Sequence, residues 1–160
     1  MISTGIYVIE NEDDLPKMYL GDIATYKLSY KQDKIIKRTL SRFYNIMDSL
    51  NYMNDSVIYR PRIFIAKPLP EDTAGFTQPI ICELGLQYFR IYLNSLYIND
   101  IPDNVFEKIV MHELIHTVAE KNILKHGSVR FDAICCRCNS MYGYNPKKLI
   151  PEEIEGSWFY

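Results

Sequence analysis

The 160-residue sequence lacks the features that mark several specialised classes of protein. It has no apolar run approaching the roughly eighteen residues of a membrane-spanning helix, and it does not begin with a basic stretch followed by an apolar segment, so we expect no secretory signal. Its four cysteines form a single Cys-x-x-Cys spacing, Cys135 to Cys138, which excludes a zinc ribbon built from two such pairs. Repeats and low-complexity tracts are absent as well. We therefore expect a single domain that does not bind membranes.

Charge of one sign is also scarce, because 18 basic and 20 acidic residues leave a net charge of −2. This balance excludes binding to nucleic acid through overall charge. Residues 25–67, however, hold nine bases and three acids, a net charge of +6. Either this block is an ordinary solvated face or four of its side chains are contacts for the DNA backbone: Lys31, Lys34, Arg38 and Arg42.

The composition favours a reducing compartment. Three of the four cysteines lie in one short segment, at Cys135, Cys136 and Cys138, where mutual disulfides would be badly strained. We expect these thiols and Cys82 to be reduced and to fill the core rather than bind metal. Isoleucine is abundant and alanine scarce, at 21 and five residues, which is typical of AT-rich genomes such as many phages carry. The expected location is cytoplasmic, or the host cytoplasm if a phage encodes the protein.

Hydrophobic periodicity predicts one long helix followed by short strands. Apolar residues recur at four-three-four-three spacing within residues 29–52, as in a helix with one buried face. Three β-like runs follow at residues 62–66, 75–81 and 88–93, separated by prolines and glycines. They predict a small antiparallel or mixed sheet of three strands and an α+β fold. Residues 1–28 are expected to form an N-terminal extension or an extra strand.

Two further helices are predicted after the strands. Residues 104–122 have the pattern of a helix that is capped by Asp103 or Asn104, with Glu107 completing a capping box. Gly143 is suited to end a later helix. That last helix is predicted from an apolar stripe made of Phe131, Ile134, Cys135, Cys138 and Met141.

The second of these three helices carries the main chemical signal, His112-Glu113-Leu114-Ile115-His116. Positions i and i+4 of a helix share one face, so both imidazoles project toward one point. Imidazole suits Zn²⁺, and a rigid helix can supply two of its four tetrahedral positions. Glu113 would reach a zinc-bound water rather than the ion and act as the general base. The motif therefore predicts one zinc ion per chain and a hydrolase.

The third zinc ligand has two candidates. All three histidines of the chain fall within fifteen residues, and the last, His126, is followed by Gly127, which permits a sharp turn back toward the ion. Glu120 is the alternative, because it lies four residues after His116 on the same helix face. We favour His126, since Glu120 would require one straight helix to supply three ligands. Either ligand leaves one position for water, as in catalytic zinc sites. The competing interpretation is a pair of core histidines and a surface one.

The surroundings of the motif resemble the SprT-like metalloprotease family, which includes the Spartan proteases. The resemblance rests on the motif, the nine residues that separate it from His126, and a following helix with Phe131, Asn139 and Gly143. An early amphipathic helix, a few short strands and the segment 89–94 precede the motif in the order of the family's minimal zincin layout.

This resemblance implies a zincin-like metalloprotease domain over residues 29–150, with the metal site on a central helix, followed by a C-terminal tail at residues 151–160. The family's zinc ligands and catalytic glutamate carry over to His112, His116, His126 and Glu113. The implied activity is peptide-bond cleavage in proteins bound on DNA or crosslinked to it, and we expect a monomer. The motif also allows a non-catalytic, zinc-stabilised module that binds DNA or protein, and a phage regulatory metallopeptidase that cleaves a repressor-like target.

Overall fold

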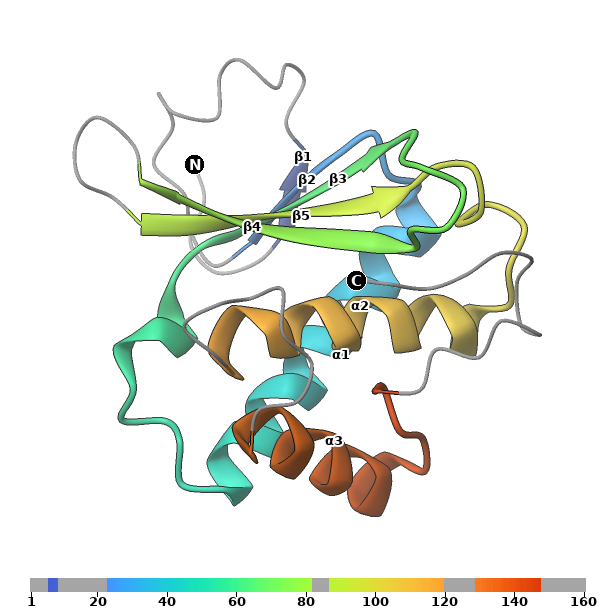
Figure 1. Cartoon of the computed structure of the whole chain (residues 1–160). Helices are drawn as coiled ribbons and strands as arrows, with labels where there is room; N and C mark the ends of the chain where they lie inside the picture. The colour runs from blue at the N-terminus through green and yellow to red at the C-terminus, as the bar shows by residue number, and fades with distance from the viewer. Residues whose placement is uncertain (1–5, 9–22, 82–86, 120–128, 148–160) are drawn as a thin grey trace.

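One mixed β-sheet and three α-helices make up the α+β fold (Figure 1). The structure is a computed structural model and describes residues 6–8, 23–81, 87–119 and 129–147. Within these residues the sheet has five strands in the order β1-β2-β3-β5-β4. Neighbouring strands are parallel except β4, which pairs antiparallel with β5 at the edge. The strands are β1 (Ile6–Val8), β2 (Ile23–Tyr26), β3 (Arg62–Lys67), β4 (Gly75–Ile81) and β5 (Gln87–Asn94).

The prediction of an α+β fold is confirmed, and the three predicted strands are β3, β4 and β5. The expected number of strands is wrong, because β1 and β2 extend the sheet beyond β3. These two strands have only three and four residues. Such short segments carry too few positions for an alternating pattern to be recognised.

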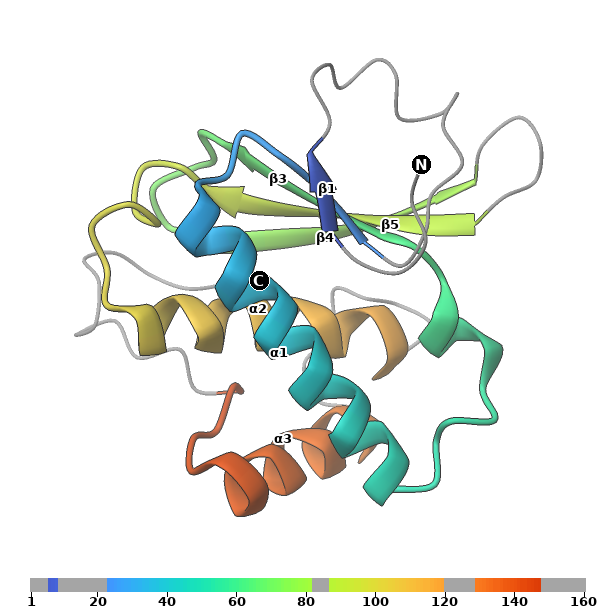
Figure 2. The same ribbon diagram turned by 180° about the vertical axis from the view of Figure 1, so that it is seen from behind.

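The helices form two layers on one side of the sheet (Figures 1 and 2). α1 (Tyr30–Ser49) and α2 (Asp103–Ala119) pack side by side next to the sheet, and α3 (Val129–Tyr142) packs on both of them, away from the sheet. A short 3-10 helix, η2 (Ser56–Tyr59), leads into β3. α2 is thus enclosed by other elements, and every residue from Ile109 to Ala119 is buried. No helix in the described part of the chain is long and apolar enough to cross a membrane.

The first helix begins where its sequence predicts. Ser29 is its N-cap: the Ser29 hydroxyl accepts a hydrogen bond from the Gln32 backbone N–H at 3.1 Å, and Gln32 Oε1 accepts one from the Ser29 N–H at 2.8 Å. This capping box satisfies two backbone donors that a helix start otherwise leaves unpaired.

The capping box predicted for α2 is wrong. Asp103 and Asn104 already lie inside the helix, and the carbonyl of Pro102 accepts hydrogen bonds from the N–H groups of Val105 and Phe106, three and four residues further on. Glu107 does not reach back to the helix start, because its carboxylate is bound by two arginines of α1. A long-range ion pair has replaced the local contact that the spacing suggested.

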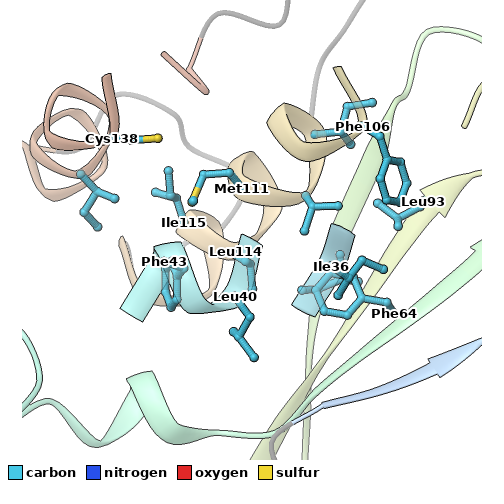
Figure 3. Packing of buried hydrophobic residues seen from close by; sticks show 14 of the residues in the cluster. Ile36, Leu40, Phe43, Phe64, Leu93, Phe106, Met111, Leu114, Ile115 and Cys138 are labelled. Atoms are coloured by element: carbon cyan, nitrogen blue, oxygen red, sulfur yellow. The ribbon is translucent and has the colours of Figure 1, made fainter. Parts of the chain in front are cut away.

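The main hydrophobic core fills the space between the sheet and α1 and α2 and continues to α3 (Figure 3). α3 buries most of its predicted stripe, including Cys135 and Cys138, so these two thiols do fill the core. The same expectation for Cys136 is wrong, because its side chain lies on the exposed face of α3. The prediction that Met141 belongs to the buried stripe is wrong, since this residue is 40% exposed at the end of the helix. Gly143 ends α3 with a φ of 82°, in the left-handed region that glycine adopts most readily. Cys82 and the tail 151–160 lie outside the described residues.

Candidate metal centre

The middle of α2 brings two imidazole rings together in the interior of the protein. The Nε2 atoms of His112 and His116 are 3.2 Å apart, and the two residues are 3% and 0% exposed. Two nitrogen ligands of a tetrahedral zinc ion, each about 2.0–2.1 Å from the metal, would be separated by about 3.3 Å. The pair therefore has the spacing that one zinc ion requires of two of its ligands.

Both rings are held by contacts from α3 and from the segment that follows it. Nδ1 of His112 lies 2.7 Å from the carbonyl oxygen of Pro146, in the segment that follows α3. A carbonyl oxygen can only accept, so Nδ1 carries the hydrogen and Nε2 keeps its lone pair for a ligand bond. Phe131 of α3, fully buried, packs against both rings, with centroid distances of 5.5 Å to His112 and 5.0 Å to His116.

Glu113 is completely buried beside the histidines, with few polar contacts. Its Oε1 accepts a hydrogen bond from the Thr77 hydroxyl of β4 at 2.8 Å, while Oε2 accepts none from the residues that the structure describes. Burial raises the pKa of Glu113 to about 8, although the Thr77 hydrogen bond acts to lower it. Ligand atoms of His112, Glu113 and His116 all lie within 4.8 Å of one another, so the three residues could hold a metal ion.

The edge strand β4 makes room for this carboxylate as well as orienting it. Gly75 and Thr77 face the same side of β4, because alternate residues of a strand share a face. A Cβ atom at Gly75 would lie 3.0 Å from Glu113 Cγ and 3.1 Å from the Tyr92 carbonyl oxygen, closer than side-chain carbons normally approach. A larger residue at this position would force Glu113 or the backbone at Tyr92 to move by a few tenths of an ångström, so glycine suits the observed placement of Glu113.

The structure thus brings together the predicted residues His112, Glu113 and His116. Both candidates for the third ligand, His126 and Glu120, lie outside the described residues. The choice of His126 over Glu120 as the third ligand therefore stays a prediction from the sequence.

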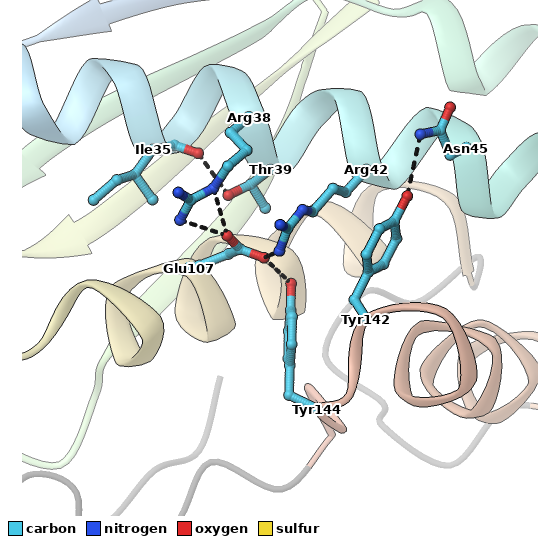
Figure 4. A network of polar contacts seen from close by, with 8 residues as sticks. All are labelled: Ile35, Arg38, Thr39, Arg42, Asn45, Glu107, Tyr142 and Tyr144. Carbon is cyan, nitrogen blue, oxygen red and sulfur yellow. Dashed lines mark hydrogen bonds and ion pairs between the residues drawn. The ribbon is translucent and has the colours of Figure 1, made fainter.

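The four basic residues predicted to contact nucleic acid fall into two pairs. Lys31 and Lys34 are exposed; Lys31 forms an ion pair with Asp103 at 3.0 Å, and the Lys34 ammonium lies 4.9 Å from the centre of the Tyr30 ring. The guanidinium groups of Arg38 and Arg42 instead bind the carboxylate of Glu107, as Figure 4 shows. Two of the four predicted contacts are therefore paired with a buried carboxylate.

Three residues that shape the site were missed by the sequence reasoning: Gly75, Thr77 and Pro146. Each reaches α2 from more than thirty positions away in the chain, and none belongs to a recognisable motif. The only local signal was the glycine within a strand pattern, which often marks a close approach of another group.

Comparison of the chain with protein-family models, with curated proteins and with solved structures gave no match. The likeness to the SprT-like family therefore rests on the motif and the order of elements, and it stays a prediction. The described residues do contain a buried His-Glu-His group with the geometry of a metal centre.

Proposed function

We propose that this protein is a zinc-dependent endopeptidase of the SprT-like, zincin-like type. The observation that carries the proposal is the buried pair of Nε2 atoms 3.2 Å apart, next to a buried carboxylate with one oxygen uncommitted among the described residues. Buried ionisable groups with few partners cost stability. They cluster at functional sites because the chemistry there requires them.

The ion would be held by His112, His116 and a third ligand, His126 or Glu120. When bound, it supplies Lewis-acid chemistry, because it acidifies a water molecule and polarises a peptide carbonyl. In this proposal the two histidines would bind the ion and hold it beside Glu113. Pro146 keeps the hydrogen of His112 on Nδ1, away from the ion.

Glu113 is the proton carrier in this proposal. Since Oε1 is committed to Thr77, Oε2 is the oxygen left to take a proton from the attacking water. The water oxygen bonds to the peptide carbon, the C–N bond breaks, and Oε2 returns the proton to the leaving nitrogen. A pKa raised by burial toward neutral pH suits a group that must both accept and release a proton.

A peptide substrate is supported by the position of β4. Among the described strands, β4 is paired on one side only, and the same strand carries Thr77, which contacts Glu113. The free backbone groups of an edge strand can pair with an extended peptide. A peptide added there would run next to the catalytic carboxylate.

Proteins bound on DNA or crosslinked to it are the substrate class that we propose in line with the resemblance. The exposed Lys31 and Lys34 on α1 support this part. Titration of the protein onto labelled single-stranded DNA at two salt concentrations tests it. The double variant Lys31→Ala/Lys34→Ala should bind more weakly and with less salt dependence, because each lost phosphate contact reduces the slope. Binding that is unchanged in this variant would remove α1 from the DNA interface.

The enzyme itself is tested by metal content, measured by mass spectrometry, together with cleavage of labelled unfolded casein. We expect one zinc ion per chain in the wild type and in Glu113→Gln, with cleavage by Glu113→Gln lower by about 10³-fold, a typical loss for a general base. His112→Ala should lose the zinc. Glu71→Gln makes the same chemical change at an exposed position and should behave as the wild type.

Two other results would point to the alternatives. Full cleavage by Glu113→Gln would end the proposed mechanism. A zinc-containing wild type that cleaves nothing, and that unfolds when His112 is replaced, would indicate the zinc-stabilised binding module. A phage regulatory metallopeptidase would share the mechanism and differ only in cleaving a repressor-like protein in preference to casein.

A further inference from the structure

The contact between His112 and Pro146 depends on a segment that has no secondary structure of its own. Pro146 lies four residues after the end of α3, and its carbonyl oxygen must sit 2.7 Å from Nδ1 of a histidine on another helix. A hydrogen bond of this kind selects the tautomer that can bind metal through Nε2. The position of residues 143–147 therefore affects the metal centre directly.

One turn and two side-chain contacts hold this short segment. Gly143 turns the chain at the end of α3. The Tyr144 hydroxyl donates a hydrogen bond to Glu107 Oε2 at 2.6 Å. Beyond Pro146, the Lys147 ammonium pairs with Asp132 of α3 at 2.6 Å, but both of these side chains are exposed, so that ion pair is weak. Apart from the contact of Pro146 with His112 itself, the Tyr144 hydrogen bond is the one of these that reaches α2.

Glu107 is a firm anchor for Tyr144. Its side chain is only 3% exposed, and its two oxygens are bound by Arg38 Nε at 2.9 Å and by Arg42 Nη1 at 2.8 Å (Figure 4). Charge-assisted hydrogen bonds from two guanidinium groups fix a carboxylate more firmly than neutral ones do. Glu107 also sits on α2, the same helix as His112, five residues before it. The anchor and the ligand therefore belong to one rigid element.

We propose that Tyr144 is a positioning residue of the metal centre. Its bond to Glu107 ties the segment after α3 to α2, and this tie keeps the Pro146 carbonyl on Nδ1 of His112. The inference rests on the proposed zinc site and goes beyond it, because it assigns the orientation of a ligand to a tyrosine that contacts neither the ion nor the substrate.

The first test compares two tyrosine-to-phenylalanine variants. Tyr144→Phe removes the hydroxyl that binds Glu107. Tyr142→Phe, two residues earlier, removes a hydroxyl that accepts only from Asn45 of α1 among the described side chains, and it is the matched control. Zinc affinity is measured by competition with a chromogenic chelator. We expect Tyr144→Phe to bind zinc about tenfold more weakly, the lower end of the usual effect of outer-shell contacts. Tyr142→Phe should bind as the wild type does.

The second test needs no metal. Long-range ¹H–¹⁵N spectra of the histidine side chains report which ring nitrogen carries the hydrogen. In the metal-free wild type, His112 should be in the Nδ1–H form, and in Tyr144→Phe the Nε2–H form should become visible. A role in stability alone would lower the melting temperature without changing this signal.

The inference is overturned if Tyr144→Phe keeps the wild-type zinc affinity and tautomer, or if Tyr142→Phe loses as much zinc affinity as Tyr144→Phe. These outcomes are distinct from failure of the proposed enzyme. A wild type that binds zinc and cleaves casein, together with an unchanged Tyr144→Phe, would refute only the role of Tyr144. A wild type that binds no zinc would refute the proposed function, and the metal-free spectra would still decide whether Tyr144 sets the tautomer of His112.

Discussion

Glu107 and Glu113 are two glutamates of one helix, both buried, yet their surroundings are opposite. Six residues correspond to about 1.7 helical turns, so the two side chains leave α2 in different directions. Glu107 meets α1 and accepts hydrogen bonds from Arg38, Arg42 and Tyr144. Glu113 meets β4 and, among the residues that the structure describes, accepts one, from the neutral hydroxyl of Thr77.

Glu107 therefore joins structural elements, whereas Glu113 is buried at a cost in stability. A buried charge with full compensation can join elements, whereas a buried carboxylate with one neutral partner lowers stability. The second arrangement is expected where the group has chemistry to perform. Four substitutions test whether the two glutamates differ in this way.

The largest effect on folding is expected at Glu107. Glu107→Gln should lower the free energy of unfolding by about 3 kcal/mol, the lower end for breaking a buried ion pair, because the arginine side chains are 50% and 35% exposed and can be hydrated once released. Urea denaturation of the metal-free protein measures this value. Stability equal to the wild type would mean that Glu107 is not the joint between the helices.

The opposite sign is expected at Glu113. In the metal-free protein, Glu113→Gln should raise the free energy of unfolding at pH 7 by about 2 kcal/mol, because it removes the cost of keeping a carboxyl group in a site that disfavours its charge. The folded-state pKa of Glu113 is raised to about 8, so its contribution to stability is present at low pH and is lost as the pH rises toward 8.

The gain should therefore be small near pH 5 and full near pH 8. Urea denaturation of both proteins in the presence of a chelator, at these two pH values, measures it. A wild type and a variant with parallel pH dependence would show that Glu113 is solvated or paired after all.

A moderate effect is expected from filling the space beside Glu113. Gly75→Ala would bring a methyl group against Glu113 Cγ and the Tyr92 carbonyl, and overpacking of this kind costs about 1–2 kcal/mol. Because the flexible partner in this clash is the glutamate, it should move, and kcat per folded molecule should fall. Thermal unfolding and steady-state cleavage separate the two effects. Normal kcat in a destabilised variant would mean that the backbone shifts instead of Glu113.

The smallest change in stability is expected at Thr77. Thr77→Val keeps the shape of the side chain but removes the hydroxyl, which donates to Glu113 Oε1 at 2.8 Å and also lies 3.2 Å from the Glu113 backbone carbonyl oxygen. Loss of the hydrogen bond to Oε1 should cost about 1 kcal/mol. That hydrogen bond lowers the pKa of Glu113, so its loss should raise this pKa and move the acidic limb of the kcat/KM profile to higher pH. Thr77→Ser keeps a hydroxyl and is the control. An unshifted profile in Thr77→Val would show that Thr77 does not tune the base.

The residues that the sequence revealed are those whose roles depend on near neighbours. The i, i+4 spacing of His112 and His116 is a property of any helix, and the periodicity of α1 and of β3 to β5 is visible within each segment. Glu107 shows the limit of this reasoning, because its spacing suggested a local cap while its two arginine partners lie more than sixty residues earlier. Thr77 and Pro146 had no local signature, and Gly75 had only that of a glycine within a strand, since the roles of all three exist only after distant elements pack together.

The distances along the chain within the metal centre also give its assembly an order. The two histidines meet as soon as α2 forms, whereas Thr77 and Pro146 join from 36 and 34 positions away. A partly folded chain can thus hold the histidine pair before it has an oriented base or a fixed tautomer. For a protease of the proposed kind, a chain in which β4 and the segment after α3 have not packed on α2 would hold both histidines and still lack the oriented carboxylate that hydrolysis requires.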